Sequence, residues 1–389
     1  MINYYKWFYI SFLAVLIVFL LKWSNLYSSI KIEMILFFSG ISILFILLSL
    51  TNHKKFSYKN FIQSKTSKNS NYFLYMIILL YIINFMYSRE IPLINAIFGV
   101  GTYYKNIPMI KTLYPLLVSV SVFVSVYYFY RFISLKNNND MFKFIIILII
   151  IVLNMGRGIL AFIFIPSLLI YISKYKLKIN SRKIFKLSIV LISFLLFFGY
   201  LGNIRTPLSL QGDDSSERIL IISDASEHFY QSNIPNEFYW FYIYIASPIS
   251  NLSNFIENKS DNISLSDYLV LSYLPQSISD NFKLDYDSKS FLVSDLFNVS
   301  TAYKLPYAFG GYLGILIYIS SMYLIFCLLH FAVRNTNYEI IYLSYISTAT
   351  ILSFFDNVIM LDVIYIPVFL SVILGLVEKS KIKIIWRIK

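Results

Sequence analysis

The sequence predicts an all-α, polytopic membrane protein with about ten transmembrane helices and one long external loop that contains short or amphipathic helices. Of its 389 residues, 58% are apolar and only 14% are charged, whereas roughly 25% are charged in a typical soluble domain. Apolar runs near the length of a bilayer recur along the chain, and Lys and Arg gather in alternate connections between them. A water-soluble globule is excluded. The net charge of +13 therefore indicates contact with membrane lipid rather than with nucleic acid.

The apolar runs cover roughly residues 7–21, 32–50, 71–88, 112–130, 142–155, 159–173, 187–202, 308–331, 338–355 and 362–377. Ten spans leave both termini on the same side. If that side is the cytoplasm, its segments hold 21 of the 33 basic residues and three of the 20 acidic residues, which is the bias of the positive-inside rule. The chain then divides into an N-terminal bundle of seven spans (1–202), a long external loop (203–307) and a C-terminal bundle of three spans with a basic cytoplasmic tail (308–389).

The first four runs are almost free of ionisable residues. The first follows Lys6 and continues to Lys22 without the small-residue pattern of a cleavage site, so we expect a retained anchor. The third ends beside Arg89, which is a candidate for anion binding. The candidate is weak because Arg89 neighbours Glu90 and can be paired with it.

The fifth and sixth runs are short and flank Asn154-Met155-Gly156-Arg157-Gly158. The fourteen residues from Lys143 to Arg157 rise only about 20 Å as a helix, against a hydrocarbon thickness of about 30 Å. Arg157 should then lie below the outer headgroups, where it must snorkel, line a wet cavity or meet an anion. The adjacent glycines permit a tight turn and a close approach of a ligand.

The seventh run leads through Gly199 and Gly202 to Arg205, followed by Pro207. An arginine at the end of a span is commonly an interfacial anchor. Two arginines on one outer face, each after a glycine-containing turn, instead favour a phosphate or diphosphate ligand, because guanidinium groups bind phosphate oxygens bidentately. Arg157 and Arg205 are therefore the main candidates.

The external loop carries 13 acidic and six basic residues, and long ordered loops commonly carry function. Within it, residues 238–256 are apolar, but a further span there would reverse the charge bias. Because Pro248 disfavours a continuous helix, we expect a helix lying on, or dipping into, the outer surface. Its aromatic side chains suit the interface and can stack on sugar rings; the candidates are Tyr239, Trp240 and Tyr244.

The loop also holds the other titratable candidates. Arg218 follows Glu217 and is expected on a solvated surface. His228 is the external histidine and a candidate base for a sugar hydroxyl, although its position favours a plain surface role. Alternative bases are Asp213, Asp214, Glu217, Asp224, Glu227, Asp285, Asp287 and Asp295.

Two further patterns concern metals and packing. Asp285-Tyr286-Asp287 resembles the Asp-x-Asp pattern by which sugar transferases hold a cation, but such a tripeptide arises easily in an acidic loop, and we expect no metal site. Gly310 and Gly314 open the eighth span at a spacing that allows close helix contact or closes one wall of an external pocket.

Several short landmarks, in this order, resemble those of the O-antigen and capsular repeat-unit polymerases (Wzy-type). They are Arg89-Glu-Ile-Pro92 with Tyr103 and Tyr104, Gly156-Arg157-Gly158, Gly202-Asn-Ile-Arg205, Tyr244-Ile-Ala-Ser-Pro248-Ile-Ser-Asn251, Phe297-Asn-Val-Ser-Thr301 and Phe309-Gly310-Gly311-Tyr-Leu-Gly314. The landmarks extend from residue 89 to 314. A plan of ten spans with a long late external loop is similar too.

The resemblance implies a metal-independent glycosyltransferase that joins undecaprenyl-diphosphate-linked oligosaccharide repeat units on the periplasmic face of the bacterial inner membrane. Arg157 and Arg205 would act as catalytic arginines, and Arg89, Arg218 and the three aromatic residues would contribute to substrate binding. No cofactor is expected, because the lipid diphosphate donor is already activated. The partners would be the lipid-linked donor and acceptor, membrane lipid and a chain-length regulator protein.

Two other readings fit the sequence. An O-antigen ligase uses the same donor and shares the long-loop plan. A flippase for lipid-linked oligosaccharides would form no bonds, and it would more naturally show repeated halves, charged spans and short loops; here the polarity is concentrated in one external loop. Another lipid-dependent glycosyltransferase is a third reading.

Overall fold

The computed structural model describes residues 4–27, 29–51, 70–98, 107–111, 113–175, 181–205, 216–258, 263–282, 292–294, 297 and 299–388. Within these ranges all regular secondary structure is helical, and the only extended pairing is a single antiparallel bridge between Ser24 and Ala225. The all-α prediction is therefore confirmed for the described part of the chain.

Each predicted span overlaps a helix. These helices are α1 (Tyr4–Phe19), α2 (Ile32–Thr51), α3 (Ser70–Ser88), α5 (Leu113–Leu135), α6 (Asn138–Leu153), α7 (Arg157–Tyr175), α8 (Ser181–Arg205), α14 (Lys304–Val333), α15 (Glu339–Leu352) and α16 (Asp362–Ile388). In the described part of the chain, six helices are long and apolar enough to cross a membrane: α2, α3, α5, α7, α14 and α16. Helices α1 and α15 and residues 188–204 of α8 are apolar but shorter. The expected count of about ten spans is thus not confirmed.

The connections contain further helices, most of them short. They are α4 (Pro92–Phe98), α9 (Arg218–Ile222), α10 (Glu227–Tyr230), α11 (Glu237–Glu257), α12 (Leu265–Tyr273), α13 (Gln276–Ser279) and the 3₁₀ turn Val358–Met360. The described part of the external loop is therefore largely helical, as expected for an ordered loop.

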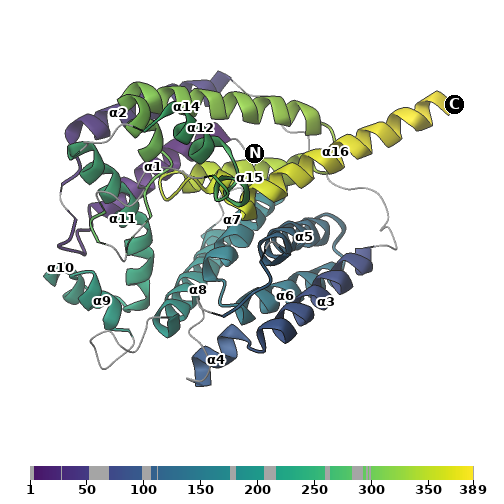
Figure 1. Cartoon of the computed structure of the whole chain (residues 1–389), viewed down its shortest axis with the longest axis horizontal. Helices are drawn as coiled ribbons and strands as arrows, with labels where there is room; N and C mark the ends of the chain where they lie inside the picture. The colour runs from purple at the N-terminus through teal and green to yellow at the C-terminus, as the bar shows by residue number, and fades with distance from the viewer. Residues whose placement is uncertain are drawn as a thin grey trace.

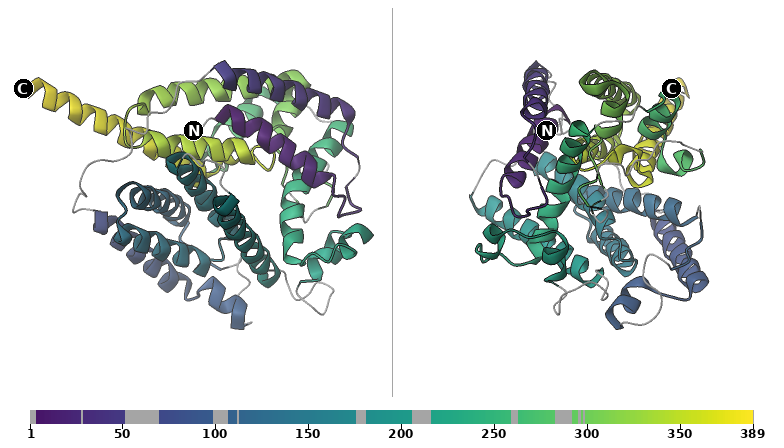
Figure 2. Two further views of the ribbon diagram at one scale, coloured as in Figure 1. Left: turned by 180° about the vertical axis from the view of Figure 1, so that it is seen from behind. Right: turned by 60° about the vertical axis from the view of Figure 1, so that its left-hand side comes forward.

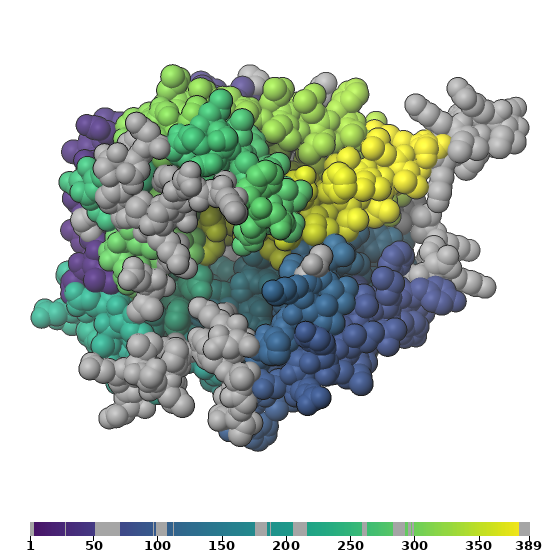
Figure 3. Space-filling model, viewed as in Figure 1, coloured from purple at the N-terminus to yellow at the C-terminus, as the bar shows by residue number. Residues whose placement is uncertain are grey.

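The helices form two groups that meet along the middle of the molecule (Figure 1). Helices α1, α2, α14, α15 and α16 form one group, and α3, α5 and α6 the other. Contacts of α16 with α5 join the two groups directly, and α7 links them by packing on both α15 and α5. Figure 2 shows the same division from behind, and in Figure 3 the side chains of α12, α14 and α16 cover the upper part of one face above those of α3 to α6.

Exposure along the helices is that of a helical membrane protein. Large apolar side chains lie on the outer surface, including Leu20, Phe73 and Phe331, which are 68%, 60% and 75% exposed. Helix α5, by contrast, buries most of its residues between its neighbours. Lipid is the solvent that makes an apolar exterior of this kind stable.

Two connections that are far apart in sequence are joined at one end of the bundle. The amide of Asn25 donates to the carbonyl of Asp224 at 2.9 Å, and the amide of Ser226 donates to the carbonyl of Trp23 at 2.8 Å. The Ser226 hydroxyl also donates to the carbonyl of Lys22 at 2.6 Å. The sequence predicts both segments on the same side of the membrane, and the structure places them in direct contact.

Helix α11 differs from its prediction. It continues unbroken through Pro248 over 21 residues, so the expected interruption is wrong. It packs on α8 and α1. Asn251, near its C-terminal end, donates to the carbonyls of Phe297 and Val299 at 2.8 and 2.7 Å. These tertiary contacts outweigh the one backbone hydrogen bond that the proline removes.

Helix α14 folds back on itself near its start. Gly310 and Gly311 leave the helical conformation, and Gly311 has φ 59° and ψ −145°, a combination available essentially to glycine alone. A Cβ on Gly314 would collide with the carbonyl oxygen of Pro306, eight residues earlier. The glycine spacing therefore serves contact between two parts of one element, rather than the contact between separate helices that the sequence suggested.

Candidate functional site

Arg157 is presented by a tight turn between α6 and α7. Met155 adopts a left-handed conformation with φ 57°, and Arg157 is the first residue of α7. A Cβ on Gly156 would lie 2.8 Å from the Ile159 side chain and 3.3 Å from the carbonyl oxygen of Ile151. Gly156 therefore packs closely against its neighbours, and the left-handed residue of the turn is Met155, whereas the sequence assigned the turn to the glycines.

The Arg157 side chain is enclosed by aromatic rings, and only 6% of the residue is exposed. Its guanidinium carbon lies 4.2 Å from the ring centre of Trp240, 5.2 Å from that of Tyr244 and 5.3 Å from that of Phe198. Its Nη2 donates to the Tyr244 hydroxyl at 2.8 Å. We call Phe198, Trp240 and Tyr244 the aromatic cage. Cation–π contacts of this kind contribute about 0.5–2 kcal/mol each.

Helix α8 supports the cage from the other side. The indole Nε1 of Trp240 donates to the Asn203 side chain at 2.7 Å. A Cβ on Gly202 would collide with Arg157 Nη1 and lie 2.7 Å from the indole. One turn earlier, a Cβ on Gly199 would collide with the carbonyl of Glu237 at the start of α11. The two glycines thus allow α8 and α11 to approach closely enough for the cage to form.

The connection between α15 and α16 completes the site. The ring of Phe355 stacks on Tyr244, with centres 5.6 Å apart and planes inclined by 26°. This brings Phe355 beside the cage, although nearly 200 residues separate it from Arg157 in the sequence. Sequence reasoning missed this segment because it reads only as the end of one apolar run and the start of the next.

Asp356 follows Phe355 and is half-buried. Its Oδ1 accepts a hydrogen bond from the amide of Asn357 at 2.7 Å. Burial raises the pKa of its carboxyl to about 6, partly offset by that hydrogen bond. The signal that could have found it is an acidic residue placed directly after two phenylalanines, in a gap of only six residues between two spans.

The other predicted arginines are placed differently. Arg205 is the last residue of α8, three positions after Gly202, but its side chain lies outside the described residues. Arg218, the first residue of α9, is 7% exposed, so the expected solvated position is wrong. Arg89 is exposed and left-handed, with φ 57°, while its neighbour Glu90 accepts from the Asn95 side chain at 2.6 Å.

Two remaining candidates, Tyr239 and His228, are not part of the cage. Tyr239, expected to face a sugar, is fully buried, and its hydroxyl donates to the carbonyl of Trp23 at 3.0 Å; it is a core residue. His228 is exposed on α10, whereas its neighbour Phe229 packs edge-to-face on Tyr239. Trp240 and Tyr244 both retain partial exposure, so their rings can meet a ligand.

The acid pair Asp285 and Asp287 lies outside the described residues. Within the described ranges no group of three or more His, Cys, Asp or Glu side chains is placed to hold a metal ion. The described side chains at the cage offer one buried arginine and aromatic faces, and Asp356 follows the phenylalanine that stacks on Tyr244.

Comparisons of the chain with family models, with curated proteins and with solved structures give no match. What the site does is therefore argued from its own residues.

Proposed function

We propose that this chain is a surface-polysaccharide polymerase of the O-antigen type, which joins undecaprenyl-diphosphate-linked oligosaccharide repeat units at the periplasmic face of the bacterial inner membrane. The observation that supports it best is the convergence of Arg157, Trp240 and Tyr244. The arginine was selected for its depth, and the aromatic residues for their capacity to stack on sugars. They come from segments more than 80 residues apart and meet in one cage.

In this proposal Arg157 binds the diphosphate of the donor. A guanidinium group retains its charge in a partly dry site and offers two parallel N–H donors to phosphate oxygens. Negative charge grows on the diphosphate as the glycosidic bond breaks, so the interaction is stronger in the transition state than in the ground state. The cage would hold the guanidinium plane in place, which keeps the reorganisation during reaction small.

The partly exposed rings would carry the sugar. Trp240 and Tyr244 present apolar faces with polar edges, and both polar edges are already engaged, the indole N–H by Asn203 and the phenol by Arg157. Rings fixed in this way can stack on a sugar without losing further rotational freedom.

The test is reconstitution of the purified full chain in liposomes. The probe is lipid-linked repeat unit extracted from native cells that lack the gene for this chain. We expect a ladder of lipid-linked oligomers, resolved by gel electrophoresis and mass spectrometry, with release of undecaprenyl diphosphate. Transfer of the saccharide to lipid A core added to the liposomes, without formation of oligomers, would indicate the ligase. Movement of the lipid across the bilayer without a new bond would indicate the flippase.

A further inference from the structure

The connection between α15 and α16 lies inside the bundle. The Ser11 hydroxyl, near the middle of α1, donates to the carbonyl of Ile351. Just after it, the ring of Phe354 lies 5.5 Å from Phe8 and 5.4 Å from Phe12, centre to centre. Non-helical backbone level with the middle of a membrane helix occurs only where it is buried in protein or lines a wet cavity.

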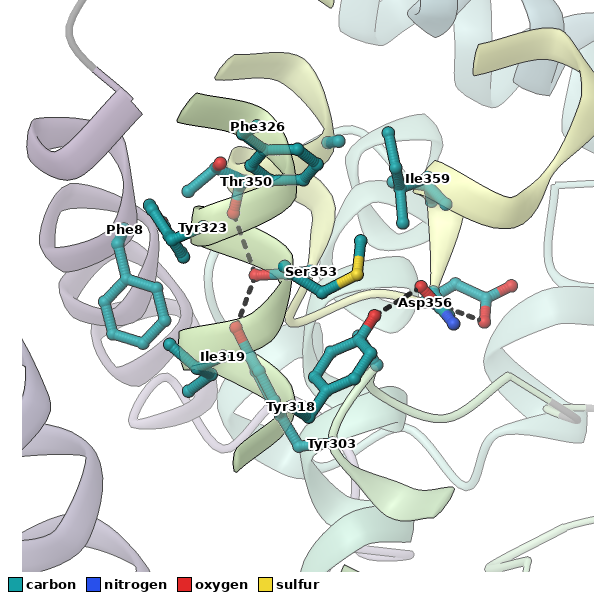
Figure 4. A pocket seen from close by; sticks show the side chains of 15 residues that line it. Phe8, Tyr303, Tyr318, Ile319, Tyr323, Phe326, Thr350, Ser353, Asp356 and Ile359 are labelled. Atoms are coloured by element: carbon teal, nitrogen blue, oxygen red, sulfur yellow. Dashed lines mark hydrogen bonds between the residues drawn. The ribbon is translucent and has the colours of Figure 1, made fainter. Parts of the chain in front are cut away.

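A cavity of about 40 Å³ adjoins this connection (Figure 4). A space of this size exceeds the roughly 10–15 Å³ that one water needs. Tyr318 lies on α14, and Tyr303 is the residue just before it. Figure 4 shows Tyr303 pointing toward Ser353 and Tyr318 pointing toward the segment that contains Asp356. The polar side chains among the described lining residues are Tyr303, Tyr318, Tyr323, Thr350, Ser353, Asp356 and Asn357.

Hydrogen bonds fix the backbone around Asp356. The Asn357 side chain accepts from the Tyr318 hydroxyl at 2.7 Å and donates to the carbonyl of Ser272 at 3.2 Å. The Tyr303 hydroxyl donates to Ser353 at 2.7 Å. Asp356 itself uses Oδ1 for the amide of Asn357, and in the described part of the chain no donor reaches its Oδ2.

Asp356 also lacks a counter-ion among the described side chains: the salt bridges formed there involve Asp140 and Glu339. Of the described residues that line the cavity, the only other titratable ones are the three tyrosines, which stay neutral at physiological pH. Ionisable groups at this depth are costly and mark functional positions by default. A half-buried carboxylate with one oxygen fixed and the other available meets the geometric needs of a proton acceptor.

The same connection closes the Arg157 site. Phe355 stacks on Tyr244, whose hydroxyl accepts from Arg157, and Asp356 is the next residue. An acceptor sugar bound against Tyr244 would therefore approach the connection that carries the carboxylate.

We infer that Asp356 is the general base of the proposed transferase, an assignment that rests on the proposed function. Its carboxylate takes the proton of the acceptor hydroxyl as that oxygen forms a bond to the anomeric carbon of the donor. The bond from that carbon to the diphosphate breaks, and its electron pair leaves with the diphosphate held by Arg157. The proton ends on Asp356 and passes to solvent before the next cycle.

The raised pKa of Asp356, about 6, agrees with this role because a base works best when its pKa lies near the working pH. The carboxylate form is the active one, so the rate should rise with pH through about 6 and level off above it. This acidic limb belongs to Asp356 if it disappears when the carboxyl is replaced.

The experiment compares wild type with Asp356→Asn and Asp356→Glu in the liposome assay, using the same extracted lipid-linked repeat. We expect the rate of Asp356→Asn to fall about 10²- to 10⁴-fold, its residual rate to be independent of pH between about 5 and 7, and its binding of the extracted lipid to be unchanged. Asp356→Glu should recover part of the rate with a displaced acidic limb. The matched control is Asp362→Asn, six residues on at the start of α16, which should act as wild type.

Each result decides the inference. A rate of Asp356→Asn within threefold of wild type overturns it while leaving the proposed function in place. Loss of lipid binding in that variant, or an equal loss in Asp362→Asn, overturns it in favour of a structural role. Absence of any transfer by wild type overturns the proposed function and, with it, the assignment of Asp356. If Asp356→Asn does not fold, partial recovery of rate with a displaced limb in Asp356→Glu decides in favour.

Discussion

Gly202→Ala is the sharpest perturbation of the Arg157 site because it changes no charged or aromatic group. The added Cβ would collide with Arg157 Nη1 and lie 2.7 Å from the Cε2 and Nε1 atoms of Trp240. Ordinary contacts between such atoms are about 3.5–4.0 Å. The indole or the guanidinium must therefore move by about 1 Å or more, which also strains the hydrogen bond from Trp240 to Asn203.

Two magnitudes follow from that displacement. Overpacking at a tight site costs about 1–3 kcal/mol of folding stability. A misplacement of about 1 Å in a catalytic constellation costs on the order of 10²-fold in rate. We therefore expect Gly202→Ala to be modestly less stable and to lose nearly all long polymer. The measurements are thermal unfolding of the purified chain in detergent and the polysaccharide ladder of a strain that carries the variant.

One other glycine serves as a control, and another tests the approach of α8 to α11. A Cβ on Gly158, next to Arg157, meets nothing within 4 Å, so Gly158→Ala should act as wild type. Gly199→Ala would collide with the backbone of Glu237 and should separate α8 from α11 without touching Arg157 directly. A wild-type ladder in Gly202→Ala, at a normal amount of protein in the membrane, would refute the reasoning that the cage positions the arginine for reaction.

Of three further substitutions, two probe the Arg157 site and one probes a separate buried ion pair. Arg157→Lys keeps the charge but loses the planar fork and its stacking, and we expect on the order of 10²-fold less polymer with normal membrane insertion; wild-type chain lengths would remove Arg157 from the mechanism. Tyr244→Phe deletes the hydroxyl that accepts from Arg157 and should lower stability by about 1–2 kcal/mol, seen as a lower melting temperature. Asp140→Asn leaves the buried Arg131, now 3.2 Å from that carboxylate, without its partner, and should destabilise the chain by about 3–5 kcal/mol; an unchanged melting temperature would contradict this.

Hydropathy predicted the helices well but not how they end. The run 112–130 corresponds to α5 at Leu113–Leu135, and 159–173 to α7 at Arg157–Tyr175, because apolar length alone defines such elements. Helix α14 begins four residues before the predicted start. Its first turns fold back at Gly310 and Gly311, a feature set by contacts with the rest of the chain, which periodicity does not record.

The site was predictable where a single residue broke a local rule. Arg157 stood out because it is a charge in apolar surroundings. Trp240 and Tyr244 stood out as aromatic residues in an otherwise acidic loop. Tyr239 could not be separated from them, because its burial depends on Trp23 in a connection more than 200 residues away. Asp356 was missed for the same reason: only the fold shows that Phe355 reaches Tyr244.

The contacts of the first helices with much later segments also set an order for the biogenesis of the chain. Residues 22–26 can complete their hydrogen bonds only after residues 223–226 have been synthesised. Helix α1 packs on α15, which the ribosome makes more than 300 residues later. The first helices therefore enter the bilayer long before the helices they pack on in the folded protein have been made. Until then, lipid or an insertion factor must cover their inward faces. A chain that ends before Glu339 would lack α15, so the face of α1 that contacts α15 would have no helix to pack on. Nascent products of that length should therefore be substrates for membrane quality-control proteases.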